Sequence, residues 1–90
     1  QTNLTQALNL AYRAVTLEPK ASFLDTLGYG YYLVRDYDKA LHYLLQAEAK
    51  AAGPELSEIL EHLILVYEAI DDQAQVNLYR ERLLTLAAGE

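Results

Sequence analysis

The sequence predicts an all-α fold built from stacked helical hairpins. Apolar residues recur at helical spacing in five segments, and no segment alternates apolar and polar residues long enough to indicate a strand. One short motif also occurs twice, 36 residues apart: Leu27, Gly28 and Tyr31, then Leu63, Ile64 and Tyr67. A repeat of about this length is typical of helical-hairpin arrays, in which each hairpin needs a neighbour to bury its apolar face.

The first two expected helices are bounded by polar residues and a proline. Asn3 is expected to cap the first helix, which runs from Leu4 to Leu17 and stops before Pro19. Ser22 is expected to cap the second helix, with Asp25 at the return position of a capping box. Turns this short force neighbouring helices to lie antiparallel.

Acidic turns separate the remaining helices. Asp36 or Asp38 is expected to cap the third helix, which ends at Gly53-Pro54 because Gly accepts a left-handed backbone and Pro favours a helix start. The fourth helix is expected to end at Ile70. Asp72 is then expected to cap the fifth helix, which is expected to end within the sequence Ala87-Ala88-Gly89.

Composition excludes several classes of partner. The net charge is −6 and the pI about 4.7, which disfavours duplex nucleic acid and anionic membrane and makes a basic protein segment the natural complement. Without Cys the chain has no disulfide and no thiolate metal site. No apolar run approaches the roughly 18 residues of a membrane span, so membrane insertion is not expected.

The central segments resemble the tetratricopeptide (TPR) repeat. The resemblance rests on Leu27, Gly28, Tyr31, Asp36, Tyr37, Ala40, Leu41, Leu44 and Ala47. It implies a TPR-like solenoid fragment of five helices, a right-handed stack of antiparallel hairpins. Three parts are then expected in a single domain spanning 1–90: the second helix of a truncated repeat (1–20), a full repeat (21–53) and a divergent repeat (54–90).

The divergent repeat departs from the family pattern in two ways. Ile64 stands where the full repeat has Gly28, and its larger side chain is expected to push the last hairpin apart. The last turn is aligned by matching Asp72 to Asp38, which makes that turn two residues shorter. Under this alignment Ala74 takes the place of Ala40, and Leu78 that of Leu44.

In this family the first helix of each hairpin lines a concave groove. The resemblance implies a groove formed by Ser22, Asp25, Tyr29 and Tyr32, and by Glu58, Glu61, Leu65 and Glu68. Both sets step by three, four and three residues, so each lies on one side of its helix. Residues 51–79 hold six acidic side chains and no Lys or Arg. We therefore expect an acidic, tyrosine-bearing groove for a basic peptide; the alternative is a merely solvated helix face.

The sequence indicates no catalytic activity and no metal or cofactor site. Glu58 and His62 form an i, i+4 pair, but a metal site needs further ligands from neighbouring elements, so no metal or cofactor is predicted. There is no Cys nucleophile and no Gly-rich phosphate loop, and Ser22 and Ser57 are typical of helix starts. A carboxylate clamp of the kind some family members use is not expected either, because the acids at the comparable positions, Asp25, Glu58 and Glu61, would repel a carboxylate.

The sequence thus predicts a non-enzymatic module for binding a protein or peptide. The alternatives are a structural segment that self-associates through its open helical ends, and the regulatory part of a larger enzyme. A start at Gln1 without Met is interpreted as a fragment of a longer chain. The compartment is not specified; the character of the repeat favours a soluble bacterial protein of cytoplasm or periplasm.

Overall fold

The computed structural model describes residues 2–89, of which 87% are helical and none forms a strand. The expected all-α fold of five helices is confirmed: α1 (Thr2–Leu17), α2 (Ala21–Leu33), α3 (Tyr37–Lys50), α4 (Gly53–Ala69) and α5 (Gln73–Gly89). The outer limits of the predicted parts 1–20 and 54–90, Gln1 and Glu90, lie outside the described residues.

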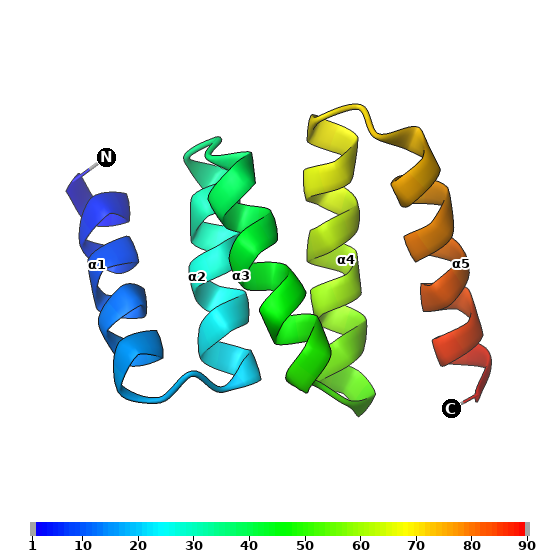
Figure 1. The fold of residues 1–90 in the computed structure, drawn as a ribbon, viewed down its shortest axis with the longest axis horizontal. Helices are drawn as coiled ribbons and strands as arrows, with labels where there is room; N and C mark the ends of the chain where they lie inside the picture. Colours follow the sequence, from blue (N-terminus) through cyan, green and yellow to red (C-terminus); the bar gives the residue numbers. More distant parts are fainter. Residues whose placement is uncertain (1, 90) are drawn as a thin grey trace.

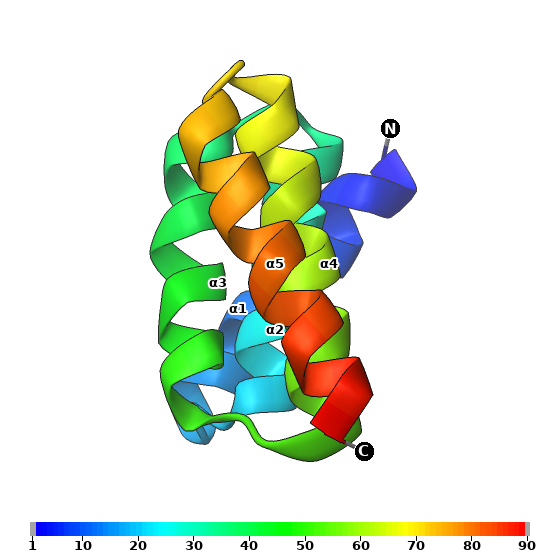
Figure 2. The ribbon, with the colours of Figure 1, turned by 90° about the vertical axis from the view of Figure 1, so that its right-hand side faces the viewer.

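The helices follow one another across the long dimension of the molecule, with α1 and α5 at opposite ends (Figure 1). Each helix packs against the next, and α2 also packs against α4, whereas α1 and α5 do not meet within residues 2–89. The extents are 38 × 27 × 17 Å, and Figure 2 shows α5 crossing obliquely in front of α4. This open, repeat-like arrangement is compatible with an α-solenoid and is not a closed bundle.

The turns that close the α2–α3 and α4–α5 hairpins have the same structure. In the first, Arg35 has a φ of 66° and the amide of Asp36 donates to the carbonyl of Tyr31, 2.9 Å away. In the second, Asp71 has a φ of 61° and the amide of Asp72 donates to the carbonyl of Tyr67, again at 2.9 Å. Both are Schellman turns, which place a left-handed residue just after the helix.

Each Schellman turn leads directly into a helix cap. The side chain of Asp36 accepts from the amide of Lys39, and that of Asp72 accepts from the amide of Gln75, both at 3.3 Å. Two predicted caps are therefore confirmed. Since Asp72 corresponds to Asp36, the alignment of Asp72 with Asp38 is wrong, and the last turn is not shortened.

The corrected alignment explains which side chains of α5 are buried. Val76 takes the place of Ala40, and both are fully buried. Ala74 and Leu78, expected to face the core, are exposed. A shift of two residues turns a helix by about 200°, which carries a side chain to the opposite face.

Three other predicted boundaries differ from the structure. Helix α1 already includes Asn3, so this residue does not cap it. The N-cap of α2 is Lys20, whose extended backbone makes no side-chain cap, and Ser22 lies inside the helix. Helix α5 continues to Gly89, because two alanines, the strongest helix formers, precede the glycine.

Helix α4 forms the centre of the core. Its buried residues face several directions: Ile59, Leu60, Leu63, Ile64, Val66 and Tyr67. A helix that is apolar on most sides must be covered on most sides. Helices α2, α3 and α5 all pack against it, and buried residues of these four helices form one continuous cluster.

Gly28 allows α2 and α3 to approach each other closely. A Cβ atom at this position would lie 2.6 Å from Leu44 Cγ and 3.1 Å from the Leu44 backbone nitrogen. The equivalent position in the next hairpin holds Ile64, which is buried. The α-carbons of α2 and α3 run close together over more of their length than those of α4 and α5, as the larger residue leads us to expect.

We predict that Gly28→Ala destabilises the protein by about 1–3 kcal/mol, because the new methyl overlaps Leu44. The overlap outweighs the helix-propensity gain of about 1 kcal/mol. The matched control is Gly30→Ala, whose Cβ would lie 2.7 Å from a terminal methyl of Leu8, which can rotate away, and at an ordinary contact distance of 3.6 Å from Leu8 Cγ. Urea unfolding followed by circular dichroism measures both. A Gly28→Ala variant as stable as Gly30→Ala contradicts the prediction.

Candidate functional site

The packing of α2 against α4 brings together side chains that lie far apart in the sequence. Asp25 and Tyr29 from α2 both contact His62 from α4, across a separation of 37 residues in the case of Asp25. We call Asp25, Tyr29, Glu58 and His62 the α2–α4 cluster. It joins the first helix of one hairpin to the first helix of the next.

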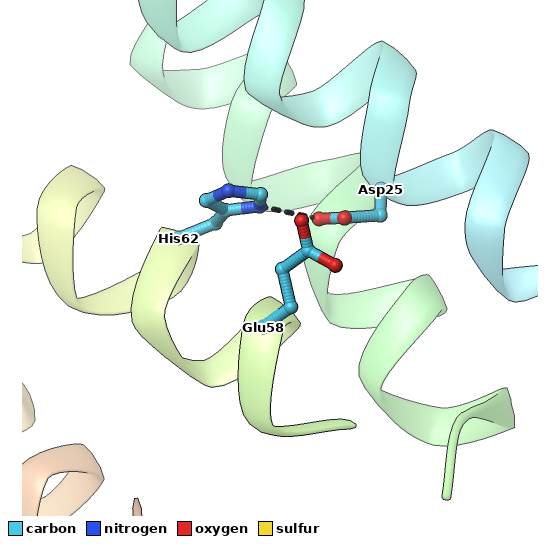
Figure 3. A group of neighbouring side chains, drawn as sticks. All are labelled: Asp25, Glu58 and His62. Atoms are coloured by element: carbon cyan, nitrogen blue, oxygen red, sulfur yellow. Dashed lines mark hydrogen bonds and ion pairs between the residues drawn. The ribbon is translucent and has the colours of Figure 1, made fainter. Parts of the chain in front are cut away.

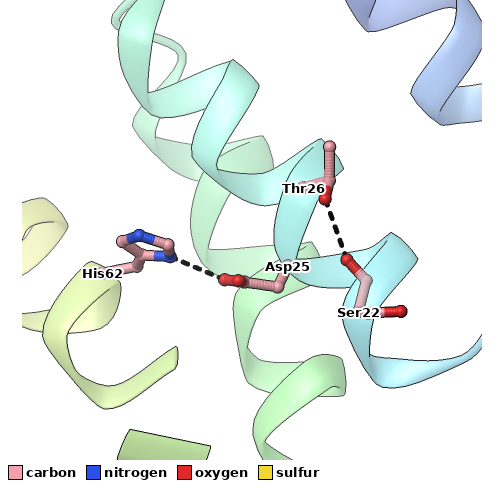
Figure 4. A network of polar contacts seen from close by, with 4 residues as sticks. All are labelled: Ser22, Asp25, Thr26 and His62. Carbon is pink, nitrogen blue, oxygen red and sulfur yellow. Dashed lines mark hydrogen bonds and ion pairs between the residues drawn. The ribbon is translucent and has the colours of Figure 1, made fainter. Parts of the chain in front are cut away.

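Asp25 is the only buried polar or charged side chain among the described residues, with 8% of the residue exposed. Its Oδ1 accepts a hydrogen bond from Nδ1 of His62 at 2.7 Å, as Figures 3 and 4 show. This short, charge-assisted bond compensates for the burial of the carboxylate. The predicted role of Asp25 at a helix start is wrong: it binds the neighbouring hairpin instead.

A row of aromatic rings continues from His62. The ring of Tyr29 stacks on the imidazole with centroids 4.4 Å apart, and Tyr32 stacks on Tyr29 at 5.7 Å. Tyr37 of α3 follows at 6.1 Å from Tyr32. Both predicted groove tyrosines are half-buried in this row, which fixes the plane of the imidazole.

Glu58 approaches the same point from one helical turn before His62. Its carboxylate extends toward the contact between Asp25 and His62 (Figure 3). One donor atom from each of Asp25, Glu58 and His62 lies within 4.8 Å of the others. Glu58 and His62 are recognisable from the sequence as an i, i+4 pair, but His62 is not recognisable as a site residue, because its partner Asp25 is supplied by a distant helix.

Two opposing effects determine the pKa of His62. Burial lowers the pKa of His62, but the hydrogen bond and charge of Asp25, aided by Glu58 and Glu61, outweigh burial and raise it above the usual value of 6.5. The imidazolium form is therefore favoured by the negative charges around it.

The other predicted groove residues behave differently. Ser22 is exposed, and only its backbone carbonyl is engaged, by the hydroxyl of Thr26 at 2.9 Å (Figure 4). Glu61 is exposed and Leu65 is half-buried. Glu68 forms an ion pair with Arg80 of α5. The structure thus brings together four of the predicted groove residues, Asp25, Tyr29, Tyr32 and Glu58. Glu68 instead contacts α5 through its ion pair with Arg80.

The fold and the cluster define an all-helical, repeat-like protein in which a polar contact joins successive hairpins. Comparison with models of protein families, with curated proteins and with solved structures finds no match. None of the helices within residues 2–89 combines the length and the apolar character needed to cross a membrane.

We predict that the Asp25–His62 contact makes stability depend on pH. Because the pKa of His62 is raised on folding, its contribution is complete below the unfolded pKa of about 6.5 and is lost as pH rises through the folded pKa. Asp25→Asn is expected to remove this dependence and to destabilise the protein by about 1–3 kcal/mol at pH 6.

Urea unfolding between pH 5.5 and 8.5, in the presence of a chelator, measures both effects. His42→Gln is the matched control, since His42 is the other histidine of the chain and is exposed. If the wild-type protein and Asp25→Asn show the same pH profile, the contact does not contribute as described.

Proposed function

We propose that this chain is a non-catalytic protein–protein interaction module with a TPR-like, right-handed stacking of its hairpins. It binds a basic segment of a peptide or protein along the face formed by α2 and α4. The observation that supports the proposal is the packing of α2 against α4, in which Asp25 of α2 and Glu58 of α4 lie close to each other.

The chemistry of this face suits a cationic segment. Glu58 and Glu61 are exposed carboxylates on α4, free to accept hydrogen bonds from Arg or Lys. The half-buried rings of Tyr29 and Tyr32 add contact area at little entropic cost, because they are already held in the aromatic row.

The charge distribution supports the same partner. Residues 51–79 contain no Lys or Arg, so the acidic side chains of α4 lack basic neighbours on their own helix. Arg80 of α5 pairs with Glu68, which leaves Glu58 and Glu61 outside the ion pairs of the described residues. A net charge of −6 further speeds encounter with a basic segment.

We predict that charge reversal by Glu61→Lys weakens binding of an Arg- and Lys-rich peptide on the order of tenfold and flattens its salt dependence. Fluorescence anisotropy with a labelled basic peptide, and with an acidic peptide of equal length, measures this effect. Glu81→Lys on α5 is the matched control, since Glu81 is also exposed and carries the same charge. Failure of the basic peptide to bind, or equal weakening by both variants, contradicts the proposal.

A second candidate function, self-association, is supported by apolar side chains on the two outer helices. Leu17 of α1 is 86% exposed and Leu84 of α5 is 72% exposed, and Leu10 adds to the outer surface of α1. Exposed apolar side chains at both ends of a hairpin stack favour end-to-end contact between copies.

We predict that, if the ends associate, the mass measured by light scattering rises with protein concentration. Leu17→Glu or Leu84→Glu then restores the monomer, because a charge at an apolar contact is costly to desolvate. A monomeric mass throughout the concentration range rules out this second function and leaves the peptide-binding proposal intact.

A further inference from the structure

We propose that Asp25, Glu58 and His62 bind a divalent transition-metal ion of the Zn²⁺ class. The site lies between α2 and α4 and combines two carboxylates with one imidazole (Figure 3). The site shares Glu58 with the proposed peptide-binding face, so an ion and a basic side chain would compete for that carboxylate, but ion binding can be tested without any partner.

The donor set and its spacing fit such an ion. Imidazole nitrogen and carboxylate oxygen are ordinary ligands of Zn²⁺, with bonds of about 2.0–2.2 Å, so two ligands of one ion lie about 3–4 Å apart. The three donor atoms already lie within 4.8 Å of one another. Binding displaces the proton of His62 Nδ1, so the 2.7 Å hydrogen bond to Asp25 Oδ1 is replaced by a bond from each residue to the ion. The side chain of Glu58, which is exposed and long, rotates to supply the third ligand.

Two of the three ligands are held in place before any ion arrives. Asp25 and His62 are largely buried on separate helices, with 12% and 18% of their side chains exposed. The ring of Tyr29, stacked on His62 at 4.4 Å, limits rotation of the imidazole. Ligands that are already ordered lose little entropy when they bind.

The local charge balance independently favours a cation. The group contains two carboxylates and one imidazole, and Asp25 is the one charged residue that the described chain buries. Among residues 2–89 its ion-pair partner is His62 alone, and Glu58 takes part in no ion pair. No Lys or Arg occurs in residues 51–79, so α4 itself supplies no compensating charge.

The limited exposure of Asp25 and His62 favours a small ion as their ligand over a basic side chain. With 12% and 18% of their side chains exposed, Asp25 and His62 are reached more readily by a small ion than by a long basic side chain. Three protein ligands also leave a fourth position for water. The bound ion would tie α2 to α4 and so strengthen the junction between successive hairpins.

The test is a titration of the metal-free protein with Zn²⁺ by calorimetry and with Co²⁺ by visible absorption. We expect one ion per chain, d–d bands typical of nitrogen and oxygen ligation, and a higher melting temperature with Zn²⁺ by mass action. Mg²⁺ should not reproduce the effect, because it prefers an octahedral, all-oxygen environment.

Variants separate this site from adventitious binding. Glu58→Gln, on the surface and therefore compatible with folding, should weaken Zn²⁺ binding at least about tenfold, and His62→Gln should abolish it. The controls His42→Gln and Glu61→Gln remove the other histidine and a neighbouring carboxylate, and should bind as the wild type does.

The inference is overturned if no Zn²⁺ binds up to about 1 mM. It is equally overturned if binding survives both Glu58→Gln and His62→Gln, or if His42→Gln removes it. Absence of Zn²⁺ binding together with loss of stability in Asp25→Asn would mean that the cluster is a structural ion pair only.

Discussion

The structure depends on one packing constraint: helix α4 is apolar on most of its sides and must be covered by three other helices. Residues such as Ile59 and Val66 are fully buried although they do not belong to the repeated Leu-x-x-x-Tyr stripe. A single hairpin cannot provide that cover, so α2 and α3 of the preceding hairpin pack against α4 from one side and α5 from another. Stacking of hairpins is therefore a requirement of the core, whereas the close approach at Gly28 lies within one hairpin, between α2 and Leu44 of α3.

The same stacking creates the α2–α4 cluster. When α4 is laid against α2, Asp25 is covered, and a covered carboxylate is tolerated only with a strong hydrogen-bond partner. His62 is that partner, placed by the apolar contacts of α4 and not by local sequence. A single polar pair between apolar surfaces also disfavours other registers of the two hairpins, because any slip would leave the carboxylate unpaired.

Equivalent positions in the two repeats therefore have different environments. Asp25 and Glu61 are 36 residues apart and occupy matching places in their hairpins, yet Asp25 is buried and Glu61 is exposed. Helix α4 covers Asp25, and no described helix lies in the corresponding position over Glu61. The repeat pattern predicted which side of each helix the groove residues share, but not which of them a neighbouring hairpin would cover.

The sequence by itself determined the number of helices and the hairpin turns at Asp36 and Asp72, because these follow from helical periodicity and from local capping. The close helix approach at Gly28 was expected only from the resemblance to a repeat family. The helix caps predicted at Asn3 and Ser22 are wrong, because both residues lie inside helices although their residue types are common at caps. The sequence pattern also misaligned α5, since Ala74 and Leu78 are as apolar as the residues that are buried. Only the tertiary structure decided that Asp25 meets His62, because that contact joins two helices through packing that no local pattern records.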